Sequence, residues 1–572
     1  MQERRKLLLL SLVTGLCSGL AAVLLLNVIS RLKILVLPVR GIAGWLFLLL
    51  PGIGMLLSLL IKKFVIRDNI DHGVTRVLYA ISRRESRIKP HNTWSSLLTS
   101  SLTIGLGGSV GAEAPIVFTG AAIGSNLGRV SGLSYKSITL LLGCGAAGAV
   151  AGIFKAPMAS LLFVMEILLF NVSLSTLAPM LISSLSATVV SYFFTGTDPM
   201  FVCELTPFSM VNIPFYLILG AVCAFGSLYF MRTTLWLEDK FAKIRGDYPR
   251  WFIGALGLGV LIMLFPMLYG EGYDIVQSLL SADAGSVAME SAFGPLTGAG
   301  WGLALFFLLL FLTKVLAMIF TNSGGGVGGT FGPTLVAGAI LGFVVAKTIN
   351  LLGYPAPIQN FVLVGMAGLM AGVMQAPMTA IFLIAEISGG YQLMLPLIIS
   401  ATTSFVIFHI FEKYSIYSKR IAQSGDLLTH DSDQAVLTLM KVSDLVKDKY
   451  PRVGMDDSLG RLAKVFRTTT AAIFVVVDAQ DRYQGIVDVE KLHKLFLDRS
   501  RYDKMHVSDF VETDLAAIRI DESMNSVMEK FEHTKAWRLP VLDADGRYLG
   551  CISNTRILMA YREELKAITI QD

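Results

Sequence analysis

The chain has 572 residues, of which 54% are hydrophobic and only 16% are charged, whereas soluble globular proteins carry about 25% charged residues. This composition excludes an ordinary soluble protein and indicates a chain that is largely embedded in membrane lipid. The net charge of +6 reflects basic loops between apolar runs, which are common in membrane proteins, so it gives no indication of nucleic-acid binding.

Long apolar runs begin at the N-terminus and recur through most of the chain. Residues 7–30 carry no charge, and about 20 apolar residues cross a bilayer as a helix. The run is longer than the apolar core of a signal peptide, about 7–15 residues, so we expect a retained first span in the cell membrane with a cytoplasmic, basic N-terminus. The basic loops 62–92 and 232–250 are expected on the same side. Further apolar runs lie near residues 42–61, 137–154, 157–170, 174–195, 213–231, 251–269, 299–320 and 392–411.

Two glycine-rich segments lie among these runs. Residues 101–128 contain a single acid, Glu113, and residues 321–342 contain none. Glycine permits tight turns and close backbone approach, and the proline that follows in each segment suits the first turn of a helix. We therefore expect two loops that open into helices within the membrane. Unpaired amides at such helix starts form an anion site without any need for a buried lysine.

Glu113 is the residue on which this site depends. A carboxylate deep in a membrane costs several kcal/mol unless something compensates it, and an amide-lined anion site would do so. Glu113 would then occupy the place of a permeating anion, and its protonation would release it and open the path. The alternative is a structural acid that is hydrogen-bonded to neighbouring amides. We predict that Glu113 is the gate.

Both parts of the chain contain internal repeats. Segments 146–166 and 365–386 share a Gly-Ala pattern, an Ala-Pro-Met triplet and a closing glutamate. Transporters with internal repeats commonly bind their substrate between the repeats, near the bilayer midplane. The composition becomes charged near Gly425, which predicts a membrane domain over 1–425. The tail that follows repeats as helix, strand, strand and helix, which predicts a tandem α/β module.

Three short motifs in the membrane part fit one known set. GAEAP (111–115) is similar to a GREGP signature, GTFGP (329–333) matches a GxFxP signature, and IYS (416–418) supplies a tyrosine near the end. In these motifs the chain resembles the CLC family of chloride channels and chloride/proton exchangers. The resemblance places the gating glutamate at Glu113, with Ala112 in place of the basic residue. It also implies anion-binding roles for His72, Gly111, Ala112, Gly329, Thr330, Phe331 and Tyr417.

The resemblance also implies a fold and partners. We expect an all-α multi-pass membrane domain of two inverted repeats with broken helices, in a homodimer with one pore per subunit. The transported ion is expected to be chloride, although fluoride-selective relatives exist, because Tyr417 is retained. The protein is expected to be a transporter in contact with membrane lipid rather than an enzyme, with no resident metal or cofactor.

Two departures from the family pattern affect the mechanism. The first signature is degraded to DHGVT (71–75), where His72 replaces a serine that the family often has. A histidine there could donate a hydrogen bond to an anion and change charge with pH, or it could face water. Second, Ile167 stands where many exchangers of the family carry an inner proton-transfer glutamate. This predicts weak or absent proton coupling and a voltage-gated chloride channel, with a chloride/proton exchanger as the alternative.

Glu166 and Glu386 do not replace the missing inner glutamate. A one-residue step turns about 100° around a helix, so Glu166 points away from the direction of Ile167. Glu166 and Glu386 are also repeat mates, which favours a structural role for both carboxylates.

The tail resembles a pair of CBS domains, over 426–502 and 503–572, expected in the cytoplasm. Nucleotide-binding copies close with a serine or threonine and a ribose-binding aspartate. Here Ser553 is the candidate nucleotide-binding residue, but Lys491 and Arg556 stand in place of the aspartates. We therefore favour a packing and coupling module over an adenine-nucleotide site.

Two other kinds of protein compete with a transporter. A membrane-tethered CBS sensor would have no use for broken helices around one buried acid. A CBS-bearing magnesium transporter would need acidic residues lining its membrane helices, and these are nearly absent from the sequence.

Overall fold

The computed structural model of the protein divides into two compact units, Met1–Leu427 and Leu428–Asp572. It describes residues 2–569 except 43, 69, 71, 84–85, 171–172, 202–203, 282, 295–297, 299, 420, 422–439, 447–449, 470, 472, 494 and 514–515. The expected boundary between 425 and 426, and the first residue of the 71–75 motif, lie outside the described residues.

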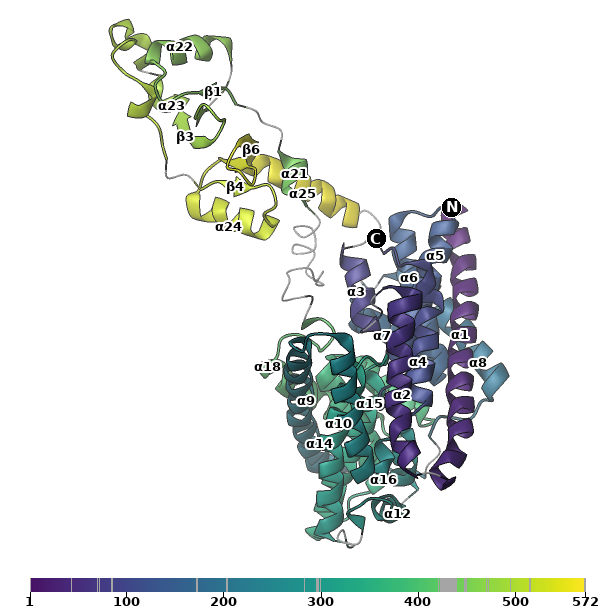
Figure 1. Ribbon diagram of the computed structural model, residues 1–572. Helices are drawn as coiled ribbons and strands as arrows, with labels where there is room; N and C mark the ends of the chain where they lie inside the picture. The colour runs from purple at the N-terminus through teal and green to yellow at the C-terminus, as the bar shows by residue number, and fades with distance from the viewer. Residues whose placement is uncertain are drawn as a thin grey trace. The chain divides into compact units, whose positions relative to one another are not determined.

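The first unit is built from helices, as the apolar runs predict. Nine helices of the described part are long and apolar enough to cross a membrane. In Figure 1 the purple and blue helices of the first half gather on one side of this unit and the teal and green helices of the second half on the other. The first half comprises α1 (Gln2–Ile42), α2 (Gly44–Leu60), α3 (Gly73–Arg83), α4 (Ser95–Gly105), α5 (Glu113–Val130), α6 (Tyr135–Phe154), α7 (Pro157–Glu166) and α8 (Leu174–Thr195). The second half comprises α9 (Ile213–Ala242), α10 (Asp247–Leu264), α11 (Tyr273–Leu280), α12 (Ala284–Met289), α14 (Trp301–Ser323), α15 (Phe331–Leu351), α16 (Ile358–Met374), α17 (Pro377–Ile387) and α18 (Met394–Phe411).

The two halves repeat the same packing. A Cβ on Gly120 of α5 would approach the Gly145 carbonyl oxygen of α6 to 2.1 Å, and one on Gly338 of α15 would approach the Gly365 carbonyl oxygen of α16 to 2.5 Å. Glycine at these crossings lets the helix backbones touch, as in other tightly packed membrane helices. The equivalent contacts confirm that the sequence repeat is a structural repeat.

Two regions expected to be basic loops contain helix. The first, residues 62–92, includes α3 (Gly73–Arg83). In the second, residues 232–250, α9 continues through the charged residues to Ala242 and α10 begins at Asp247. A hydropathy profile identifies only the apolar part of a helix. The helix itself continues until its backbone hydrogen bonding ends. The extension places charged side chains of α9 beside the candidate site.

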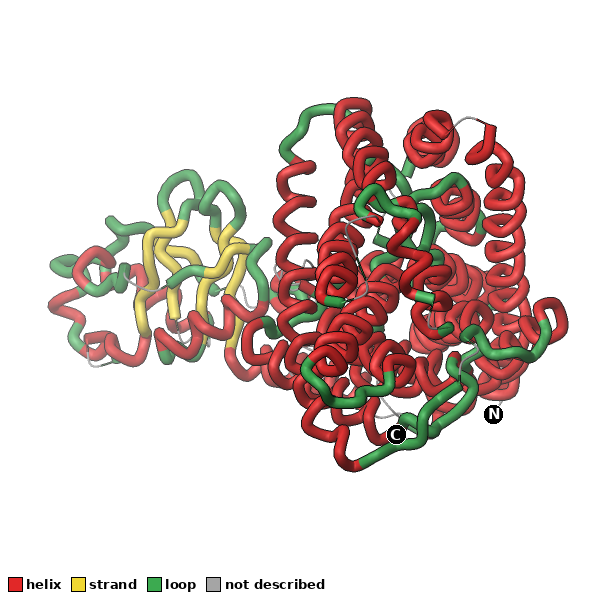
Figure 2. The backbone as a smooth tube through the Cα atoms, turned by 90° about the horizontal axis from the view of Figure 1, so that it is seen from below, coloured by secondary structure: helices red, strands yellow, loops and turns green. Residues whose placement is uncertain are grey.

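The second unit contains the strands that the structure describes, drawn yellow in Figure 2. Each of its halves has a three-stranded sheet in which the first strand runs parallel and the third antiparallel to the middle strand. The two halves meet through backbone bonds, from the Tyr483 amide to the Gly546 carbonyl and from the Tyr548 amide to the Asp481 carbonyl, both 3.1 Å. The strands are β1 (Arg452–Val453), β2 (Ile473–Val477), β3 (Tyr483–Asp488), β4 (Ile518–Arg519), β5 (Arg538–Leu542) and β6 (Tyr548–Ser553). The helices are α21 (Val442–Leu445), α22 (Leu459–Thr468), α23 (Val489–Leu492), α24 (Met524–Thr534) and α25 (Asn554–Thr569). The tandem α/β module is confirmed.

Candidate functional site

The starts of α5 and α15 meet at two glycines. Gly111 and Gly329 pair as an isolated antiparallel bridge, with amide-to-carbonyl distances of 3.0 and 2.7 Å. A Cβ on Gly111 would come within 2.0 Å of the Glu113 carboxylate, and one on Gly329 within 2.9 Å of the Ala114 Cβ atom. Glycine is therefore required on both sides. The bridge brings the amide ends of two helices from different repeats to one point.

The Glu113 carboxylate lies at this point and is 2% exposed. Its Oε2 atom accepts a hydrogen bond of 3.2 Å from the Gly332 amide, in the first turn of α15. Its Oε1 atom accepts one of 2.5 Å from the hydroxyl of Tyr273, the first residue of α11. The first amides of a helix lack intrahelical partners and carry partial positive charge. The carboxylate therefore occupies a position that would suit a small anion.

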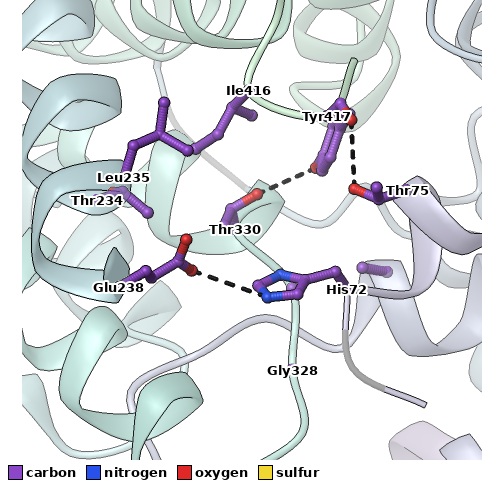
Figure 3. A pocket seen from close by; sticks show the side chains of 11 residues that line it. His72, Thr75, Thr234, Leu235, Glu238, Gly328, Thr330, Ile416 and Tyr417 are labelled. Carbon is purple, nitrogen blue, oxygen red and sulfur yellow. Dashed lines mark hydrogen bonds and ion pairs between the residues drawn. The ribbon is translucent and has the colours of Figure 1, made fainter. Parts of the chain in front are cut away.

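A small cavity of about 20 Å³ lies beside the bridge and is drawn in Figure 3. Of the seven predicted anion-binding residues, His72, Gly329, Thr330 and Tyr417 line this cavity. The Thr330 hydroxyl donates to the Tyr417 hydroxyl at 3.2 Å, so these two polar groups meet at the wall. Space of about 10–15 Å³ is enough for one water, so the cavity admits one occupant of about that size.

The other three predicted residues lie outside the cavity lining. Gly111 belongs to the bridge, and Ala112 is fully buried. The Phe331 ring packs against the rings of Phe154 and Phe163, with centroids 5.5 and 6.0 Å away. These residues hold the helix starts in place, and the structure does not bring them to the same space as Tyr417.

A second hollow of about 380 Å³ adjoins the first at His72 and Glu238, which line both. The Nε2 atom of His72 lies 3.9 Å from a Glu238 carboxylate oxygen. Glu238 was not predicted from the sequence, because it falls in the run 232–250, where the basic residues indicate a loop. Glu238 lies within four residues of apolar residues that continue a helical pattern. This pattern could have indicated that the helix extends as far as Glu238.

A fully buried cation lies behind the gate. The Lys314 ammonium on α14 donates to the Ser109 hydroxyl at 2.9 Å and to the carbonyls of Gly270 and Glu271 at 3.3 and 2.8 Å. Its hydrogen-bond partners among the described residues do not include Glu113 or Gly332, so this lysine is not one of the groups that hold the carboxylate at the helix start. Lys314 is the sole charged residue between Trp301 and Ser323, and a lone charge within a membrane span is a signal for function.

Glu166 and Glu386 have the structural role that their repeat predicted. Glu386 accepts from the amides of Met158 and Ala159 at the start of α7, at 3.1 and 2.9 Å. Glu166 accepts from the amides of Met378 and Thr379 at the start of α17, at 3.0 and 2.7 Å. Each carboxylate thus caps the helix of the other repeat.

Ile167 follows Glu166 at the end of α7 and is 4% exposed. Its hydrocarbon side chain cannot hold a proton at the position where the family resemblance expects a glutamate.

In the tail, the residues considered for nucleotide binding already have partners within the protein. The Ser553 hydroxyl accepts from the Arg556 amide at 3.3 Å, at the start of α25. Lys491 forms an ion pair with Glu512, and this hydrogen bond raises the pKa of the lysine. At the positions that align with a nucleotide-binding motif, Ser553 therefore caps a helix and Lys491 forms a surface ion pair.

Known proteins are similar to this chain in sequence or in fold. A Ralstonia nicotianae protein named as ClcB-like chloride channel protein is 28% identical over 401 residues, covering 68% of this chain and 89% of the relative. The H(+)/Cl(−) exchange transporter ClcA of Salmonella newport is 27% identical over 451 residues, covering 75% and 90%. The solved structure of a eukaryotic CLC transporter is 17% identical with a TM-score of 0.62, covering 96% and 97%.

Family models match both units. The model described as voltage gated chloride channel matches residues 53–409, and the CBS domain model matches residues 442–498 and 507–563. A slow cyanobacterial Cl−/H+ antiporter shares the fold of the first unit, with a TM-score of 0.62 at 20% identity over 73% of this chain and 97% of that one. By these matches, and by the paired helix starts around Glu113, the chain belongs to the voltage gated chloride channel family and carries two C-terminal CBS domains.

Proposed function

We propose that the protein carries chloride across the membrane along a path that passes the small cavity and is closed by Glu113. The observation that supports this most strongly is the buried Glu113 carboxylate on the Gly332 amide. A helix N-terminus binds an anion through its amides and dipole, so the carboxylate acts as a tethered anion that excludes a free one. A protonated Glu113 has no charge to hold it on the amide, and a chloride ion can then take its place.

We further propose that chloride moves in exchange for protons. Relatives 27% identical over 451 residues are named H(+)/Cl(−) exchange transporters, and Glu113 is a carboxylate that protonation would move. A passive channel is the second candidate. It is favoured by the buried hydrocarbon of Ile167 at the inner position and stays the expectation from sequence.

The two modes differ in whether protons move uphill. In proteoliposomes with the membrane potential clamped, an imposed chloride gradient is expected to drive protons against their own gradient at a fixed ratio to chloride. The ratio is fixed because each transport cycle requires one protonation of Glu113. The measurement is simultaneous recording of chloride and internal pH. Chloride flux that dissipates its gradient with no uphill proton movement would establish the channel instead.

For the tail we propose a packing and coupling role without adenine-nucleotide binding. Millimolar ATP is expected to leave the thermal unfolding temperature of the full-length protein in detergent unchanged. A lysine and an arginine stand where a ribose-binding carboxylate would be needed, and the Ser553 hydroxyl already caps α25. Titration calorimetry is the check, with ADP and AMP run beside ATP. Saturable binding at micromolar concentration would overturn this, and Lys491→Asp would then show whether the lysine contacts phosphate.

The family resemblance also implies a homodimer with one pathway per subunit, and a cytoplasmic N-terminus and tail. These stay predictions, which cross-linking in membranes and labelling of introduced cysteines can test.

A further inference from the structure

A histidine and a carboxylate face each other in the smaller hollow of the membrane unit (Figure 3), and both also line the larger one. His72 lies just before α3, and Glu238 lies near the C-terminal end of α9. The side chain of Glu238 is 11% exposed and that of His72 is 38% exposed. Gly328 also lines both hollows, and His72 and Glu238 are the titratable residues where the two adjoin.

His72 is held in place by an unusual backbone conformation. Its φ angle of 55° lies in the left-handed region, which residues other than glycine seldom adopt and which costs energy. The next residue, Gly73, is so close to α5 that a Cβ on it would lie 2.5 Å from the Ala114 carbonyl oxygen. His72 is thereby fixed beside the first turn of the helix that carries Glu113.

The other charged groups that line these hollows line only the larger one. Asp239, the neighbour of Glu238 on α9, and Arg250 on α10 line the larger hollow. The Arg250 guanidinium donates to the carbonyls of Ile244 and Ala242, both at 2.9 Å. The smaller hollow carries the Tyr417 hydroxyl opposite the pair. Among these charged groups, His72 and Glu238 line both hollows.

We propose that His72 and Glu238 are the inner proton-transfer groups of this protein, in place of the glutamate that Ile167 replaces. This inference rests on the proposed exchange of chloride for protons. A proton from water in the larger hollow binds the Glu238 carboxylate and passes to the imidazole of His72. From there it moves to a water in the smaller hollow, which Ala114 lines, and then to the carboxylate of the adjacent Glu113, which becomes neutral. Glu238 and His72 return to their starting states, ready for the next proton.

The distances suit such a relay. At 3.9 Å the pair is too far apart for a direct hydrogen bond. One bridging water or a small side-chain rotation brings the groups within the reach that proton transfer needs. The smaller hollow, at about 20 Å³, is large enough for one water, and the hydroxyls of Thr330 and Tyr417, which line it, could orient that water. A bare proton could not cross the apolar surroundings of Ile167.

The test compares full-length wild type with Glu238→Gln in proteoliposomes, under a chloride gradient with clamped potential. Glu238→Gln is expected to lose uphill proton movement by about tenfold or more, the scale of losing one proton-transfer group, while chloride flux persists. Asp239→Asn, one residue away and lining the larger hollow alone, is the matched control and should keep wild-type coupling. Adding Ile167→Glu to Glu238→Gln should restore proton movement, which a merely structural role for Glu238 does not predict.

The outcomes separate the two proposals. If wild type moves no protons uphill, the exchange function fails and the relay falls with it. If wild type is coupled and Glu238→Gln moves protons at the same ratio, the relay alone is overturned. If Glu238→Gln does not fold, His72→Gln decides: a wild-type ratio of protons to chloride in that variant overturns the relay, and a lower ratio of protons to chloride supports it, whatever the absolute chloride rate.

Discussion

The Glu113→Gln variant is expected to transport chloride at a rate that hardly changes between about pH 4.5 and about pH 7.5, and to move no protons uphill. The carboxamide has the size of the protonated acid and cannot lose a proton. Its oxygen can still accept from the Gly332 amide, while its NH₂ group can donate to the Tyr273 hydroxyl, which rotates to accept. The variant should therefore fold normally and lose only the charge that holds the gate closed.

The matched control is Glu386→Gln. Glu386 also accepts two hydrogen bonds from backbone amides, those of Met158 and Ala159, but it caps α7 rather than facing the start of α15. This variant should be less stable, by about 1–3 kcal/mol for one buried donor left without its acceptor, and should keep wild-type pH dependence. A steep pH dependence that survives in Glu113→Gln would remove Glu113 from the gating role.

The centre of the site was predictable because its constraints are local in sequence. A lone acid between Gly111 and Pro115, in an apolar segment, needs compensation wherever the helices lie. The second glycine-rich segment, 321–342, then predicts a second helix start of the same kind. The structure confirms that the two starts meet, and it places the Gly332 amide on Glu113.

The partners supplied by other helices were not predictable in this way. Tyr273 reaches Glu113 across 160 residues of sequence, and nothing in the pattern of the short helix α11 distinguishes that tyrosine from a packing residue. Glu238 was concealed by its basic neighbours, because charge marks a loop in a hydropathy profile even where the helix continues. Both contacts depend on how the repeats pack against each other, which a single sequence does not specify.

Replacing Lys314 should perturb the two segments that carry Glu113 and Tyr273. Its ammonium joins the loop that leads into α5, through the Ser109 hydroxyl, to the turn that leads into α11, through the carbonyls of Gly270 and Glu271. The first segment delivers Glu113 and the second delivers Tyr273. One cation thus sets the distance between the gate and its hydroxyl donor.

Lys314→Met is accordingly expected to lower the thermal unfolding temperature and to reduce chloride flux at every pH. Methionine fills the space of the stem but leaves buried acceptors unpaired, at about 1–3 kcal/mol each. Lys33→Met is the matched control: Lys33 pairs with the Glu271 carboxylate at 3.1 Å, but its side chain is 34% exposed, and its removal leaves the Lys314 bonds to the Gly270 and Glu271 carbonyls in place. The measurements are unfolding followed by intrinsic fluorescence in detergent and chloride efflux from proteoliposomes. A Lys314→Met protein as stable and as active as Lys33→Met would mean that the ammonium does not hold these two segments together. If Lys314→Arg retains stability while flux falls, the lysine's hydrogen-bond geometry, and not its charge alone, positions Tyr273 against Glu113.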